Sequence, residues 1–76
     1  MNVDIEKKVG RNIRNLRIKA HLSQEMLSEK LQLEGCDVTR SAVAKIEVGQ
    51  RHLYIDELIL IKKILNVSYE DIFVID

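Results

Sequence analysis

The chain has 76 residues, which suffices for one small domain and excludes a second. Its apolar share of 46% excludes a disordered protein, and a single cysteine, Cys36, excludes an intrachain disulfide. No apolar run is long enough to span a membrane, and the first residues lack the apolar core of a signal peptide. We therefore expect one folded domain, residues 1–76, that is cytoplasmic and has no membrane partner.

The charges are spread unevenly along the chain, although they sum to zero. Zero net charge is unusual for a DNA-binding domain, since most are basic overall. Half of the twelve basic residues lie before residue 20, where the only acidic residues are Asp4 and Glu6. Acidic residues predominate from Asp56 onward. One end of the sequence can therefore face an anion while the other repels it.

The first predicted helix runs from Asp4 to about Lys19. The apolar residues that recur at the spacing of one helical face are Val9, Ile13, Leu16 and Ala20. This stripe is expected to be buried, with the basic residues on a solvated face. His21 tolerates a left-handed backbone and is expected to end the helix.

A second helix is predicted to begin at Ser23, whose hydroxyl can cap its first amides. It continues through Leu33, and Gly35 ends it. Cys36 lies in the loop that follows. A lone cysteine with no second thiol or nearby histidine favours a small apolar filler over a redox or metal site.

A third, short helix is predicted between a cap at Thr39 and a stop at Gly49. Val43 and Ile46 are three residues apart, so they share a face that can be buried. At about 100° per residue, the residues on the opposite side are Arg40, Ser41, Ala44, Lys45 and Val48. This outer face is small, polar and mildly basic.

A fourth helix, Ile55 to Leu65, is apolar on nearly all sides. The sequence leaves open whether it is central in the fold or exposes its apolar surplus as a subunit interface. Asn66 can end it. Ser68 and Asp71 have the spacing of a capping box for a last helix, from Tyr69 to about Val74. These elements predict an all-α domain.

Three segments in this order resemble the Cro and phage-repressor type of helix-turn-helix domain, also called XRE-like. The segments are LSQEMLSEKL, VTRSAVAKIEVGQR and LNVSYEDIF. The resemblance covers nearly the whole chain. It implies a compact five-helix, lambda-repressor-like fold with the helix-turn-helix motif at helices 2 and 3. It also implies a homodimer that binds double-stranded operator DNA and regulates transcription.

The resemblance further implies roles for individual residues. The positions that match base-reading residues in the major groove are Thr39, Arg40, Ser41, Ala44 and Lys45. Those that match contacts to the DNA backbone are Gln24, Gln50 and Arg51. Gln24 also matches a residue that braces the recognition helix, and Arg17 and Glu47 match an internal salt bridge that ties this helix to the first one.

Arg40 is the first choice for base reading and Lys45 the second, because a guanidinium can donate two hydrogen bonds to guanine. The alternative for Arg40 is a contact to phosphate only, since half or more of protein–DNA hydrogen bonds go to the backbone. The alternative for Arg17 is an exposed side chain that binds phosphate.

The sequence departs from the family most clearly between its two motif helices. The stretch from Gln32 to Asp37 makes the turn longer than usual. It could change the angle of the recognition helix, or bring Asp37 or the backbone of Gly35 near the duplex. The family's dimer surface cannot be copied either, and Leu60 and Ile64 of the fourth helix are the candidate dimer contacts.

We expect a sequence-specific DNA-binding regulator, a repressor. The alternative is a protein-interaction module on the same fold, antitoxin-like or a signalling partner, which the apolar fourth helix and zero net charge favour. An enzyme is not expected, because His21 and His52 lack metal-ligand spacing and no nucleotide-binding motif is present. We expect no cofactor, no metal and no small-molecule substrate.

Overall fold

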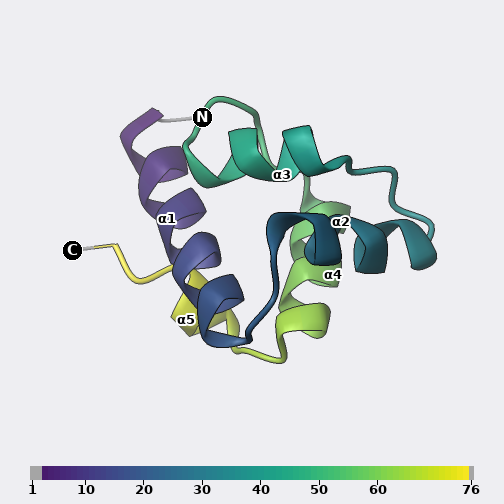
Figure 1. Ribbon diagram of the computed structural model, residues 1–76. Helices are drawn as coiled ribbons and strands as arrows, with labels where there is room; N and C mark the ends of the chain where they lie inside the picture. The colour runs from purple at the N-terminus through teal and green to yellow at the C-terminus, as the bar shows by residue number, and fades with distance from the viewer. Residues whose placement is uncertain (1–2, 76) are drawn as a thin grey trace.

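The computed structural model describes residues 3–75, and within them all regular secondary structure is helical (Figure 1). The helices are α1 (Val3–Lys19), α2 (Gln24–Leu33), α3 (Arg40–Glu47), α4 (Ile55–Leu65) and α5 (Tyr69–Ile72). Helix α3 lies across one end of the bundle and packs on α1 and α2, while α2 also packs on α4 and α5 on α1. The predicted all-α fold of five helices is confirmed.

Three helices begin at the capping residues predicted from the sequence. The hydroxyls of Ser23 and Thr39 each accept a hydrogen bond from the amide three residues further on, at 3.0 and 3.1 Å. Ser68 and Asp71 form the reciprocal bonds of a capping box at the start of α5. Each of these helices therefore begins at a capping side chain three residues before the amide that it binds.

The chain reverses after α1 and α4 at the two non-glycine residues with positive φ. These are His21, with φ of 61°, and Asn66, with φ of 54°. Histidine and asparagine are among the side chains that tolerate this backbone region. Both predicted helix ends are confirmed.

The last helix is shorter than predicted and ends at Ile72 instead of near Val74. The Asn12 side chain of α1 donates to the carbonyl oxygens of both residues, at 2.8 Å each. It thereby holds the chain after Ile72 on a non-helical path. Ile72 is fully buried, whereas Val74 is exposed.

The hydrophobic core lies among the first four helices and includes one residue of α5. Its buried members are Val9, Ile13, Leu27, Leu31, Val38, Val43, Ile46, Ile61, Leu65 and Ile72. Ala20, expected in the buried stripe of α1, is exposed because the chain has already left the helix for the turn at that point. Leu22 packs against the core from the same turn.

For α4, the question that the sequence left open is answered by its burial: one side packs on the core and the other is exposed. Ile61 and Leu65 are buried, but Ile55 is 77% exposed and Ile59 48% exposed. Other helices cover only one side of α4, and its apolar surplus faces outward. Leu60 and Ile64 are half-buried against the core.

Helices α1 and α3 come into backbone contact at Gly10. A Cβ at this position would overlap the carbonyl oxygen of Ile46 and would lie 2.9 Å from that of Glu47. A side chain here would push the two helices apart, since backbone atoms cannot rotate away. Gly10 therefore sets the distance between α1 and the helix predicted to carry the site.

Candidate nucleic-acid interface

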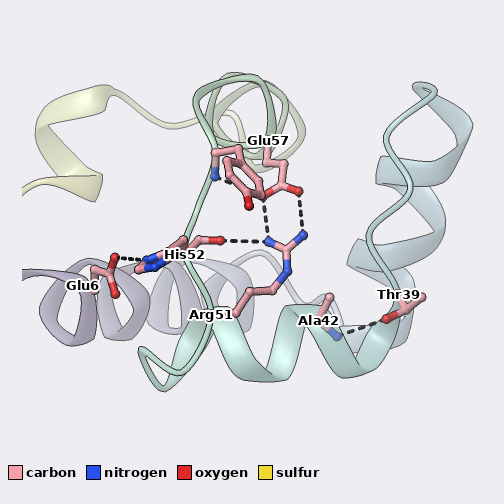
Figure 2. A network of polar contacts seen from close by, with 7 residues as sticks. Glu6, Thr39, Ala42, Arg51, His52 and Glu57 are labelled. Atoms are coloured by element: carbon pink, nitrogen blue, oxygen red, sulfur yellow. Dashed lines mark hydrogen bonds and ion pairs between the residues drawn. The ribbon is translucent and has the colours of Figure 1, made fainter. Parts of the chain in front are cut away.

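Helix α3 presents the face predicted from its sequence. The residues turned outward are Arg40, Ser41 and Lys45, which are exposed, and Ala44, which is half-buried. Thr39 is also exposed and caps the start of the helix (Figure 2). Val43 and Ile46 are buried on the opposite side. The helix thus offers small and cationic side chains to a ligand while its apolar side holds it on the core.

A buried ion pair joins α1 to the end of α3. Arg17 Nε lies 2.7 Å from Glu47 Oε2, and Arg17 Nη2 donates to Glu47 Oε1 at 3.0 Å. The third donor, Nη1, bonds the carbonyl oxygen of Leu22 at 2.8 Å. Both charged residues are buried, so neither charge is displayed on the outer face. The pair stiffens α3 from behind, because its geometry is bidentate.

Gln24, the first residue of α2, joins the same cluster. Its Nε2 donates to Glu47 Oε1 at 3.0 Å. The side chain is half-buried and borders a surface hollow together with Arg14, Ser23 and Arg40. Gln24 is therefore in contact with the bracing pair and also faces the surface beside the start of α3.

Gln50 and Arg51, in the loop after α3, differ sharply in environment. The Gln50 side chain is exposed. Its backbone N–H donates to the carbonyl oxygen of Lys45 at 2.9 Å, at the end of α3. The guanidinium of Arg51 instead turns to α4, where it binds both carboxylate oxygens of Glu57 at 2.8 and 2.9 Å (Figure 2). It also donates to the carbonyl oxygen of His52 at 3.0 Å.

This arrangement gives Arg51 a partner that the resemblance did not imply. Its hydrogen bonds with Glu57 raise the pKa of the guanidinium and lower the pKa of the Glu57 carboxyl. Glu57 also accepts from the Tyr54 amide at 3.1 Å. A phosphate would have to compete with these bonds for Arg51, and the backbone contact implied by the resemblance stays a prediction.

A hydrogen bond between His52 and Glu6, which the sequence did not indicate, ties the same loop to α1. His52 Nδ1 lies 2.6 Å from Glu6 Oε1, and the Glu6 side chain is buried while His52 is largely exposed (Figure 2). The two residues are 46 positions apart, so spacing within a helix could not reveal the contact. With the Arg51 pair, it anchors the exit of α3 to α1 and α4.

The long turn between α2 and α3 is anchored as well. Val38 is fully buried, and its carbonyl oxygen accepts a bond from Ser28 Oγ of α2 at 2.6 Å. Cys36 packs against the core, and its burial raises the pKa of its thiol. This environment fits an apolar filler. Gly35 and Asp37, the two residues named as possible DNA contacts, are exposed.

The His, Cys, Asp and Glu side chains of the described region, residues 3–75, form no group of three that could hold a metal ion. None of its helices combines the length and the apolar character needed to cross a membrane.

A family model described as helix-turn-helix matches residues 13–72. The matched region includes α2 and α3 with their turn, the Arg17–Glu47 pair and the exit loop. Searches of curated proteins and of solved structures found no match. The match covers most of the chain, and the fold has the helices that it requires. The chain therefore belongs to the helix-turn-helix family of DNA-binding domains, of the Cro and phage-repressor type.

Proposed function

We propose that the protein is a cytoplasmic transcriptional repressor that binds a specific double-stranded DNA sequence through the major groove. One observation carries the proposal: α3 exposes Arg40, Ser41 and Lys45, while a buried ion pair and a glycine contact hold its inner side. A rigid helix with an unobstructed cationic face suits a groove that admits an α-helix.

Arg40 and Lys45 are the proposed base readers. Both are long, exposed donors, and a bidentate bond from Arg40 to guanine would distinguish it from other bases. Ser41 and Ala44 are small enough for the helix to approach base edges closely. Thr39 stands at the N-terminus of α3 and would lie nearest the base edges at that end.

Gln24 and Gln50 are the proposed contacts to DNA phosphates. Gln24 opens α2 and lies beside Arg40 and Glu47, and Gln50 lies in the loop after α3, so both are next to the recognition helix. Neutral amides can donate to phosphate oxygens without reading sequence. Arg51 is the third proposed contact, and its guanidinium also supports this loop through Glu57.

Binding to the DNA upstream of the protein's own coding region tests the proposal. Titrations against that duplex and a random duplex, at several salt concentrations, should show a clear sequence preference and a slope of about −0.9 per phosphate neutralised. Absence of any preference over random DNA at moderate salt would refute sequence-specific binding.

Two substitutions separate base reading from backbone contact. Arg40→Ala should reduce discrimination at one base pair by about 1 to 3 kcal/mol. Gln24→Ala should weaken binding to all sequences alike. Lys30→Ala, an exposed change elsewhere on α2, is the matched control. If Arg40→Ala weakens every sequence equally, Arg40 contacts phosphate only.

Repression itself needs a transcription readout. On a template carrying the bound site upstream of a promoter, added protein should lower transcript yield, and Arg40→Ala should abolish the effect. A rise in transcript yield would instead indicate an activator.

The protein is proposed to act as a homodimer, as pairs of half-sites favour two-fold symmetry. Helix α4 is the candidate contact, with Ile55 and Ile59 exposed and Leu60 and Ile64 half-buried. Mass measurements over a range of concentrations should show dimers that Ile59→Asp disrupts. A monomer at all concentrations, both free and on DNA, would contradict this part.

The exposed apolar residues of α4 also favour a second candidate, a protein-interaction module on the same fold. That function would leave the α3 face without a DNA preference and would require Ile55 and Ile59 for binding a protein partner. The titration against upstream and random DNA therefore separates the two candidates.

A further inference from the structure

A stripe of cations runs along one side of α1. Its members are Lys7, Arg11 and Arg14, spaced four and three residues apart, so they share one helical face. All three side chains are exposed. The ion pairs within residues 3–75 involve other residues, so the charge of this stripe is not neutralised there.

The stripe lies directly beside the end of α3. Lys7, Arg11 and Arg14 border one surface hollow together with Glu47 and Val48. The backbones of α1 and of the loop after α3 are also close at Lys7 and Gly49. A Cβ on Gly49 would lie 3.0 Å from the Lys7 Cα. The N-terminal half of α1 therefore runs along the exit of the recognition helix.

The stripe also reaches the beginning of the recognition helix. Arg14 borders a second hollow together with Gln24 and Arg40. Arg14 is thus shared between the two hollows, one at each end of α3. Through Arg14, the cations of α1 are therefore continuous with Gln24 and Arg40, two of the proposed contact residues.

A helix seated in the major groove has a phosphate backbone on each flank. Exposed guanidinium groups without an internal partner are well suited to phosphate, because they donate hydrogen bonds in a planar fork. Two acidic residues border the hollows. Glu47 is buried and paired with Arg17, so it does not oppose a polyanion, whereas Glu25 is exposed beside Arg14 and Arg40 and is outnumbered by them.

We propose that Lys7, Arg11 and Arg14 form a second backbone-binding surface, which grips the phosphates of one DNA strand alongside α3. The inference rests on the proposed DNA-binding function and adds a source of affinity independent of sequence. It also accounts for how a chain with zero net charge can bind a polyanion: the cations needed are concentrated on one flank of α3.

The test compares two triple variants with the same change in net charge. The stripe variant carries Lys7→Gln, Arg11→Gln and Arg14→Gln. The control carries Lys8→Gln, Lys19→Gln and Lys30→Gln, all at exposed positions outside the two hollows. Thermal unfolding of each variant checks that the fold is retained. Affinity for the upstream duplex and a random duplex is then measured from low to moderate salt.

If each stripe residue neutralises one phosphate, the salt slope of the stripe variant should be shallower by about 2.7, at roughly 0.9 per contact. Its affinity should fall on both duplexes by a similar factor, so that the preference for the upstream sequence persists. The control should keep nearly the wild-type slope, because its cations lie away from the duplex.

The two proposals fail in different ways. Equal slopes for the stripe variant and the control, in a protein that still prefers the upstream duplex, would overturn the stripe and leave the proposed function intact. A wild-type protein without sequence preference would refute the proposed function, yet a slope lost only in the stripe variant would still support a polyanion surface on α1. Absence of salt-dependent binding in the wild type would overturn both.

Discussion

Gly10→Ala provides a direct test of the contact between α1 and α3, because two physical effects predict opposite signs. In an isolated helix, alanine is about 0.8 to 1 kcal/mol more favourable than glycine. In this fold, the added methyl group would overlap the carbonyl oxygen of Ile46 and would lie 2.9 Å from that of Glu47. The sign of the stability change therefore decides which effect is larger.

The clash should prevail. Overpacking by one methyl group costs about 1 to 3 kcal/mol, and this site belongs near the upper end because the opposing atoms are backbone oxygens. After subtraction of the gain in helix propensity, we expect a net destabilisation of about 1 to 2 kcal/mol. The midpoint of urea unfolding should then fall by roughly 1 M, given a slope of about 1 to 3 kcal/mol per M.

Equilibrium urea unfolding followed by circular dichroism measures this change. Lys8, an exposed position on the same helix, supplies the control. The difference between Lys8→Ala and Lys8→Gly gives the propensity contribution without a tertiary contact, and it can be subtracted from the value for Gly10→Ala.

An increase in stability of Gly10→Ala equal to the Ala–Gly difference at Lys8 would refute the reasoning. It would mean that the two helices do not meet at this position, and that α3 is not positioned by α1 there.

Three further predictions concern the supports around α3. Glu47→Ala should lower the free energy of unfolding by about 3 to 5 kcal/mol, because it leaves the buried Arg17 unpaired, and a double change to Arg17→Met and Glu47→Leu should recover most of the loss in urea unfolding. The hydrogen bond with Arg51 lowers the pKa of Glu57 from 4.5, so the stability it contributes is present above that value and is lost as the pH falls through the lower pKa of the folded state. In acid unfolding, Glu57→Gln should therefore lose less stability per pH unit than the wild type. An equal loss in both proteins would contradict the Arg51–Glu57 pair. Thr39→Ala removes a helix cap and should cost about 1 kcal/mol, seen as a drop of several degrees in Tm, whereas Thr39→Ser should retain it; identical Tm values for both variants would contradict the cap.

Features determined by neighbouring residues could be predicted from the sequence. The caps at Ser23, Thr39 and Ser68 each need one side chain and an amide three residues away. The positive φ of His21 and Asn66 follows from the backbone tolerance of those residue types. The outward face of α3 was also predictable, because it depends only on helical spacing.

Contacts between distant segments could not be predicted in this way. The Arg51–Glu57 pair joins a loop to the next helix, and the Glu6–His52 contact joins that loop to α1, 46 positions away in the sequence. The sequence shows that Arg51 is cationic, but only the fold shows that its guanidinium is paired with the carboxylate of Glu57. The resemblance supplied the Arg17–Glu47 pair because it carries spatial information that the spacing of apolar residues lacks.

Helix α4 illustrates the same limit for burial. Its composition is compatible with a central helix and with an edge helix that exposes an apolar face, since hydrophobicity alone does not say how many neighbours cover it. Other helices cover only the side of Ile61 and Leu65. The exposure of Ile55 and Ile59 follows from the arrangement of the other helices, which the pattern within α4 does not encode.

The turn before α3 is longer than usual for the motif, yet its last residues are held in place by contacts with α2. If residues 34–39 were slack, Val38 would be solvated and its carbonyl oxygen would bond to water. Instead Val38 is fully buried and is bonded by Ser28 of α2, which Gln32 also contacts at 3.0 Å. The start of α3 is thus tied to α2 by side-chain contacts that span the turn. This anchor holds the start of α3 in place, while the turn itself is exposed at Asp37 and at Gly35, whose φ of 83° favours glycine.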